Sequence, residues 1–218
     1  MIGLKRGTVA LYPHDGEWEA EAEHTIKILR SLLRDEAVDI QHIGSTAVRS
    51  IRAKPIIDIA LSVRSFEDIL RKKTVLKKNG FHFRNSDIEN QLLFACGSYY
   101  EGTGEEQTHF IHVVFDGSKE WQDYLLVRDY LNSNRHAARE YEALKCRLAE
   151  ECPVDSGRRH YLAGKHDFIA SLKRTALIEK YLGQTVSIQI DRPLGYIHKK
   201  ENYGQNNFKR RIGKKYSK

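Results

Sequence analysis

Two neighbouring segments carry the residue types that phosphate chemistry needs. The run 42–48, HIGSTAV, ends an alternating apolar stretch in Gly44-Ser45, and Asp58 follows thirteen residues after Ser45 inside the apolar run 56–61. Gly44 lets the backbone approach a phosphate closely, and the Ser45 hydroxyl can donate a hydrogen bond to it. A carboxylate among isoleucines is costly unless it meets a cation or hydrogen-bond donors, and Mg²⁺ is the natural cation beside a phosphate. The pattern predicts a site for a nucleoside triphosphate or another phosphorylated small molecule, with Asp58 as metal ligand. A structural acid bonded to backbone amides is the alternative.

Three of the histidines on the predicted strands, His42, His109 and His112, could contribute to such a site. His109 and His112 are three residues apart on the run 108–115. They therefore point to opposite faces and are not expected to bind one metal together. His112, flanked by apolar residues, is the candidate catalytic residue of the two, and a hydrogen-bonded core histidine is the alternative. His42 precedes Gly44 by two residues and is expected to face the same cleft, with the same alternative.

Cations recur beside aromatic residues in the C-terminal part of the chain. Lys165 follows Tyr161 on an apolar stripe, and Lys145 follows Tyr141 at the same spacing. A lysine on such a stripe commonly extends to the edge and keeps its ammonium in water, and a phosphate contact in the cleft is the alternative. The candidate phosphate- or nucleotide-binding residues are His42, Gly44, Ser45, Lys54, Arg128, Tyr141, Lys145, Tyr161 and Lys165.

Hydrophobic periodicity predicts the elements that position these residues. Residues 17–34 repeat apolar positions every three or four residues, which indicates a helix. Ser65 is placed to cap a helix over 66–79 that Gly80 ends. The expected strands are 38–43, 56–63, 81–84, 91–96, 108–115 and 185–190, with a loop or hairpin turn at 97–107. The remaining expected helices are 119–132, 137–151 and 158–181.

This order of elements predicts an α/β (α+β) fold, a mixed sheet flanked by helices with a helical C-terminal segment. We expect one domain over residues 8–178 and a basic, disordered tail over 184–218. The formal net charge of +7 lies entirely in residues 198–218, so residues 1–197 carry no net charge. A nucleic-acid partner is therefore indicated by the tail alone, and deletion of 184–218 would test it.

Composition excludes several classes of protein. The chain has 218 residues, of which 40% are hydrophobic, and no apolar run approaches the ~20 residues of a membrane span. No apolar stretch of signal-peptide length begins the sequence, and the three cysteines form no C-x-x-C pair. We therefore expect a cytoplasmic protein without a membrane partner.

Several segments together resemble the GrpB family over residues 8–176. They are HIGSTAV, AKPIIDI, THFIHVV, VRDYL, AREYEALKCRLA and KHDFI. That family is similar to the nucleotidyltransferase fold of the polymerase beta superfamily, so the resemblance implies that fold and metal-dependent nucleotidyl transfer. In the superfamily a second carboxylate follows the first by two residues, but Ala60 stands there in this chain. A non-catalytic nucleotide- or phosphate-binding module is therefore the alternative. Asp87 and Glu89 are the candidates for a further carboxylate in the cleft.

The tail shows a second, shorter resemblance. Residues 186–195 and 202–204 are similar to early motifs of a small inorganic-diphosphatase-like family. About twenty residues match, and the acidic metal ligands of such an enzyme do not fit in the remainder. We expect no activity from this segment.

Overall fold

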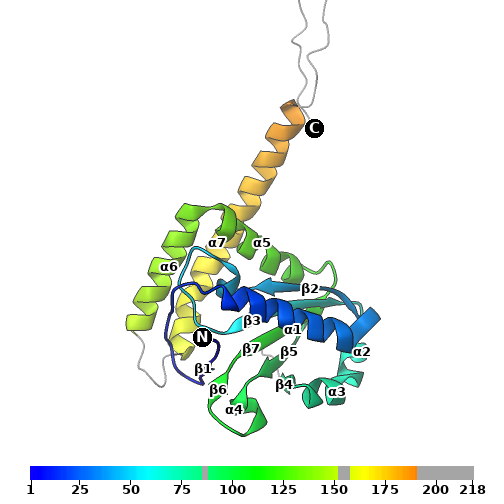
Figure 1. The fold of residues 1–218 in the computed structure, drawn as a ribbon. Coiled ribbons are helices and arrows are strands. Elements are labelled where there is room, and N and C mark those ends of the chain that lie inside the picture. The colour runs from blue at the N-terminus through cyan, green and yellow to red at the C-terminus, as the bar shows by residue number, and fades with distance from the viewer. Residues whose placement is uncertain (85–87, 152–157, 191–218) are drawn as a thin grey trace, which may run out of the picture. The chain divides into compact units, whose positions relative to one another are not determined.

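The computed structural model describes residues 1–84, 88–151 and 158–190 (Figure 1). The chain divides into two units, Met1–Tyr181 and Leu182–Lys218. The first unit contains both sheets and all the candidate site residues. In the second unit the structure describes helical backbone as far as Ile190. The expected disorder of the basic tail beyond it stays a prediction.

A mixed five-stranded sheet lies at the centre of the first unit. Its strand order is β2-β3-β7-β5-β4, with β2 at Ala37–Ile43, β3 at Ile57–Val63, β7 at His109–Phe115, β5 at Gln91–Cys96 and β4 at His82–Arg84. Strands β3 and β7 run parallel, and the other neighbours are antiparallel. A second sheet pairs β1 (Leu4–Lys5) with β6 (Glu106–Gln107). The inner position of β3 explains its almost continuous apolar sequence, because it is covered on both faces.

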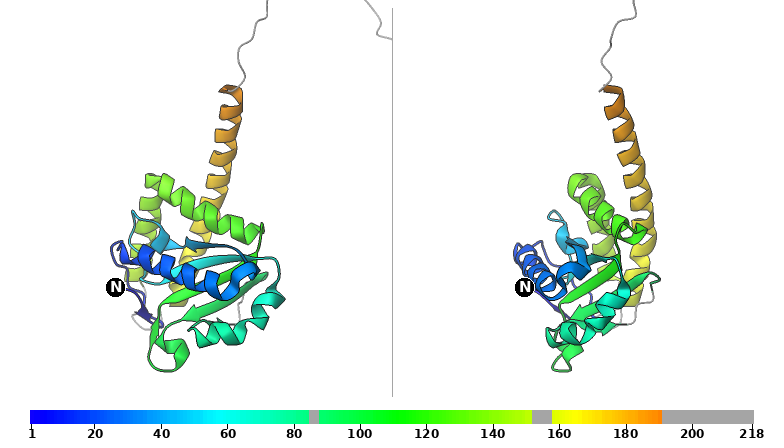
Figure 2. Two further views of the ribbon diagram at one scale, coloured as in Figure 1. Left: turned by 45° about the vertical axis from the view of Figure 1, so that its right-hand side comes forward. Right: turned by 90° about the vertical axis from the view of Figure 1, so that its right-hand side faces the viewer.

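Helices cover both faces of the large sheet. Their bounds are α1 Glu17–Leu33, α2 Phe66–Arg71, α3 Lys73–Lys78, α4 Ser98–Glu101, α5 Lys119–Ser133, α6 Arg135–Glu150 and α7 Arg158–Ile190, with 3-10 turns at Arg34–Glu36 and Ser45–Ala47. Buried Trp18 and Leu29 pack α1 on one face, and Trp121 packs α5 on the other against Ile43 and Val114. The right-hand view of Figure 2 shows the sheet between these two layers. In the described part of the chain, no helix is long and apolar enough to cross a membrane.

The predicted fold class is confirmed: the structure is a mixed sheet flanked by helices, with helices at the C-terminal end. The strands expected in the body all form, with bounds that differ by at most one residue. Ser65 caps α2 as predicted, because its hydroxyl accepts a hydrogen bond from the Asp68 amide at 3.3 Å.

Three predictions of local structure were wrong or incomplete. The helix expected over 66–79 is two helices that meet at Lys72. The turn expected over 97–107 contains α4 and the strand β6, which pairs with the unpredicted β1. The strand expected over 185–190 is helix, since it continues α7. Its Val186-Ile188-Ile190 alternation is typical of a strand, but extending an existing helix bonds each added amide locally, whereas a strand needs a neighbour. Asp87 lies outside the described residues.

Candidate functional site

Asp58 and Gly44 lie against each other where β2 and β3 meet. Ile43 pairs with Asp58 in the antiparallel register, so the chain leaves β2 directly beside the carboxylate. Gly44 has a φ of +72°, and a Cβ built on it would lie 2.5 Å from Asp58 Oδ2. A side chain at position 44 is therefore opposed by both the backbone conformation and the carboxylate. The close approach that Gly44 makes in this structure is to Asp58.

Hydrogen bonds fix the orientation of Asp58 through His112. The Tyr124 hydroxyl donates to Gln91 Oε1 at 2.6 Å, which turns the amide NH₂ of Gln91 toward His112 Nδ1 at 3.2 Å. Nδ1 then accepts, so Nε2 carries the ring proton and donates to Asp58 Oδ1 at 3.2 Å. Both ring nitrogens are engaged. This geometry favours a positioning role for His112 over a role as a free base.

Ala60 occupies the place of the second carboxylate in a buried apolar environment. It is fully buried and packs with Ile43, Val114 and Trp121. His112 is its register partner on β7. A carboxylate at position 60 would therefore enter an apolar cluster, so more than one side chain separates this site from a two-carboxylate site.

The donor set suits at most one magnesium ion. Within the described residues no group of three or more His, Cys, Asp or Glu side chains is placed to hold a metal ion. Glu89 is exposed. Mg²⁺ is commonly bound by one or two carboxylates together with phosphate oxygens and water. Asp58 therefore fits a single ion that arrives with a phosphate ligand, and the described part of the chain does not offer the ligands for a pair of ions.

Ser45 links the Gly44 loop to α6 through Tyr141. The two hydroxyl groups are hydrogen-bonded, and the Tyr141 side chain is buried. Burial raises the pKa of Tyr141 to about 12, the Ser45 hydrogen bond lowers it and the charge of Asp58 raises it. Burial likewise raises the pKa of Tyr124, with a further contribution from Asp58. The charge of Asp58 thus contributes to the raised pKa of both tyrosines, and both hydroxyl groups stay neutral at physiological pH.

Lys145 is the most unusual side chain in this region. It has no exposed surface, donates a hydrogen bond to the Arg52 carbonyl, and its Nζ lies 4.8 Å from the centroid of the Tyr141 ring. Burial lowers the pKa of Lys145 to about 7, and the charge of Lys165 lowers it further while Glu142 raises it. The alternative in which this lysine extends into water does not hold for Lys145.

Two more lysines contact the ring of Tyr161, and one of them, Lys165, is close enough to Lys145 to lower its pKa. The Tyr161 side chain is 1% exposed, and the Nζ atoms of Lys54 and Lys165 lie 4.8 and 4.6 Å from its ring centroid. A Cβ built on Gly164 would lie 2.5 Å from Leu148 Cδ2, so a glycine there lets α7 approach α6 closely. The packing of these two helices thus gathers cations from three separate segments of the chain.

His42 and His109 lie on the opposite face of the sheet from Asp58. His42 pairs with Ile59, and its Nε2 is 2.9 Å from Thr46 Oγ1. Burial lowers the pKa of His42 to about 4, so the ring is neutral at physiological pH. It lines a cavity of about 570 Å³ beside α1. The structure therefore does not bring His42 to the cleft of Asp58. His109 Nε2 contacts Thr25 Oγ1 at 3.2 Å, which confirms that it faces away from His112.

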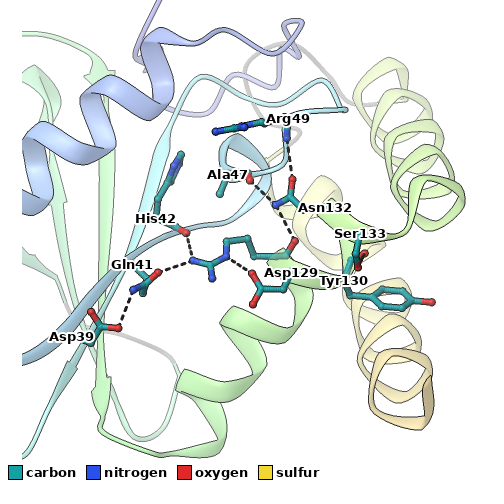
Figure 3. Close-up of polar contacts among 10 residues, drawn as sticks. Asp39, Gln41, His42, Ala47, Arg49, Asp129, Tyr130, Asn132 and Ser133 are labelled. Atoms are coloured by element: carbon teal, nitrogen blue, oxygen red, sulfur yellow. Dashed lines mark hydrogen bonds and ion pairs between the residues drawn. The ribbon is translucent and has the colours of Figure 1, made fainter. Parts of the chain in front are cut away.

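Arg128 braces the end of β2 against α5. Its Nη1 donates to Gln41 Oε1 at 2.9 Å and to the His42 carbonyl at 3.0 Å, and its Nε donates to Asp129 at 2.7 Å. One turn later Asn132 donates to the Ala47 carbonyl at 2.9 Å, as Figure 3 shows. These bonds hold both ends of the Gly44 loop. A phosphate contact by Arg128 stays a prediction.

Sequence reasoning missed three of these contributors. Gln91 and Tyr124 orient His112, and Gly164 permits the approach of α7. Gln91 is a polar residue at the start of the apolar strand 91–96, which was a usable signal. The other two depend on which helix faces which strand, and no local pattern contains that.

The fold agrees with comparisons to known proteins. The family model described as GrpB protein matches residues 8–175. The glutamate-rich protein GrpB of Alkalihalophilus pseudofirmus is 34% identical over 171 residues, which cover 78% of this chain and 96% of that protein. The crystal structure of the conserved protein GrpB from Enterococcus faecalis is 26% identical with a TM-score of 0.70, covering 79% of this chain and 99% of that one.

This chain is more distantly similar to a crystal structure of Cid1 poly(U) polymerase with MgGTP bound. The identity is 16% and the TM-score 0.46, over 70% of this chain and 50% of the polymerase. That likeness is too slight to carry an argument about activity. The family match, by contrast, covers most of the chain and agrees with a solved structure. The chain belongs to the GrpB family.

Proposed function

We propose that this protein binds the phosphate groups of a nucleoside triphosphate or another phosphorylated small molecule. The site consists of the Gly44-Ser45 loop, Asp58 and the lysine cluster, defined as Lys54, Lys145 and Lys165. The observation that carries the proposal is the fully buried ammonium of Lys145 beside the charge of Lys165. An ammonium that is deprived of water and repelled by a second cation is stabilised when an anion enters.

The loop supplies the complementary contacts. Ser45 is hydrogen-bonded to Tyr141, whose ring lies beside Lys145, so the hydroxyl and the lysine cluster belong to one neighbourhood. Lysine ammonium groups bind phosphate as point charges, and a serine hydroxyl adds one directed hydrogen bond. Asp58 lies beside Gly44, the residue that precedes Ser45. A polyphosphate would thus meet cations at one end and a single carboxylate at the other.

The orientation of Asp58 favours a second candidate function, metal-assisted nucleotidyl transfer. Asp58 would hold one Mg²⁺ ion, which would neutralise phosphate charge at this place. His112 keeps one carboxylate oxygen engaged and so fixes the direction of the other. The buried, apolar position of Ala60 does not favour the two-metal form of this reaction.

A thermal-shift screen of the purified protein tests binding. Each nucleoside triphosphate, and inorganic triphosphate, would be added with and without Mg²⁺ or Mn²⁺. A ligand at about 100 times its dissociation constant adds roughly 2.7 kcal/mol to the free energy of unfolding, which is readily measured. A shift with any triphosphate supports the proposal, and no shift with any of them at millimolar concentration contradicts it. Release of pyrophosphate from a bound nucleotide would separate transfer from binding.

A further inference from the structure

A hollow of about 430 Å³ at the edge of the large sheet combines aromatic rings with cations. It lies at β4, and the rings of Phe83, Tyr99 and Tyr100 line it. These rings are half-buried, so each keeps a solvent-facing part. Strand β4 is the edge strand of the sheet, and β3, which carries Asp58, is three strands away in the strand order. The two strands are therefore about 14 Å apart. Figure 1 shows α3 and α4 beside β4. The hollow is thus separate from the proposed phosphate site.

Cations surround the rings in direct contact. Lys73 Nζ lies 4.3 Å from the centroid of the Phe83 ring, and Arg84 Cζ lies 5.2 Å from that of Tyr100. Arg6 Cζ lies 4.6 Å from the Tyr99 ring centroid, outside the lining itself. Lys77 adds a further exposed charge one turn along α3 from Lys73. Among the described residues, no carboxylate lines the hollow.

We propose that this basic-aromatic hollow binds single-stranded nucleic acid. Bases stack on aromatic rings and on guanidinium planes, and lysines along the same groove contact the phosphates. The exposed cations extend over both α3 and β4, so several of them can contact successive phosphates of a strand, whereas one mononucleotide would engage few. The rings and the guanidinium groups stacked on them distinguish the hollow from a purely basic patch, which would serve an acidic peptide equally well.

The test measures binding of a fluorescent ten-nucleotide RNA, and of the DNA of the same sequence, to the full chain. The charge variant is K73E/K77E, two exposed residues four apart on one helix. Its matched control is R135E/R139E, an exposed pair with the same spacing on α6. Both variants change the net charge by the same amount and retain the basic tail. Binding that arises from the tail or from net charge therefore falls equally in both.

The charge variant should weaken binding at least tenfold relative to the control. The slope of log K against log salt should fall in magnitude by about 1.4, which is about 0.7 for each of two lost phosphate contacts on a single strand. A third variant, Tyr99→Leu, keeps an apolar side chain but removes a ring. We expect about tenfold weaker binding from it, with a melting temperature lowered by no more than about 4 °C, because only the contacts of the ring with Arg6 and Tyr100 are lost.

Three results would overturn the proposal. Equal loss in the charge variant and its control would assign binding to the tail or to net charge. An unchanged affinity of Tyr99→Leu would remove the stacking role. Competition by mononucleotide as effective as by the oligonucleotide, or by poly-glutamate at equal charge concentration, would assign the hollow to a small ligand or to an acidic peptide.

Discussion

Replacement of Lys145 by Met should stabilise the free protein and weaken its binding of phosphate at least tenfold. Met has similar length and no charge, so the substitution removes a buried ammonium without leaving a large cavity. The pKa of Lys145 falls from 10.5 to about 7 on folding, mainly because the side chain is buried. At about 1.36 kcal/mol per pKa unit, the protonated form costs the folded state roughly 4–5 kcal/mol at pH 7. The lost hydrogen bond to the Arg52 carbonyl costs about 1–3 kcal/mol. The expected net gain at pH 7 is about 2 kcal/mol.

The sign of the pH dependence follows from proton binding in the two states. Between pH 7 and 10.5 the unfolded chain keeps a proton on Lys145 that the folded chain has lost. Stability from this group therefore rises with pH in that range, and the full penalty applies below pH 7. The free energy of unfolding of the wild type should rise relative to Lys145→Met by about 4 kcal/mol from pH 7 to pH 10. Groups common to both proteins cancel in this difference.

Urea unfolding of both proteins at pH 7, 8, 9 and 10 measures these quantities. Equal slopes against denaturant would establish that the two transitions expose the same surface. The reasoning is refuted if Lys145→Met loses 2 kcal/mol or more at pH 7 and the difference between the proteins does not change with pH. Lys145 would then be a structural hydrogen-bond donor with an ordinary pKa, and the lysine cluster would lose its central argument.

Three further substitutions test the rest of the site. Asp58→Asn should change the free energy of unfolding by less than about 1 kcal/mol, because the Asp58 side chain is 30% exposed and Asn can still accept a hydrogen bond from His112. The stabilisation of the protein by Mg²⁺ with nucleotide should disappear. A loss of about 3 kcal/mol with an unchanged response to the ion would make Asp58 a structural residue. Gly44→Ala should destabilise by about 1–3 kcal/mol in urea unfolding, because its Cβ meets Asp58 at a positive φ, and an unchanged midpoint would contradict that geometry. Gly164→Ala should lower the free energy of unfolding by about 1–3 kcal/mol, because the added methyl group overlaps Leu148. The same substitution should cost less in a protein that already carries Leu148→Ala. If the stability losses of the two substitutions simply add, the contact is absent.

Local patterns predicted the elements of this fold well. The alternation over 38–43 and 108–115 corresponds to β2 and β7, and the three-residue spacing of His109 and His112 correctly placed them on opposite faces. These predictions succeed because side-chain direction in a strand repeats every two residues, whatever lies elsewhere in the chain. The error over 185–190 has the same origin, since apolar alternation indicates a strand only where a neighbouring strand is available.

The site depended on contacts that no local pattern contains. The cleft expected for His42 required the register of β2 against β3, which pairs Ile43 with Asp58 and turns His42 to the other face. The burial of Lys145 required the approach of α7, which Gly164 permits. The positioning of His112 required Gln91 from β5 and Tyr124 from α5. Each of these contacts joins segments more than ten residues apart, so tertiary packing alone decides it.

Calorimetric titration of inorganic triphosphate into the wild type and Lys145→Met at pH 7 tests the central claim most directly. Lys27→Met, which removes an exposed lysine on α1, is the matched control. We predict that the wild type and Lys27→Met bind with equal affinity, that Lys145→Met binds at least tenfold more weakly, and that the wild-type affinity declines from pH 7 to pH 9 as Lys145 loses its proton. Equal affinity of Lys145→Met and the wild type, or no binding to any of the three proteins, would contradict the account.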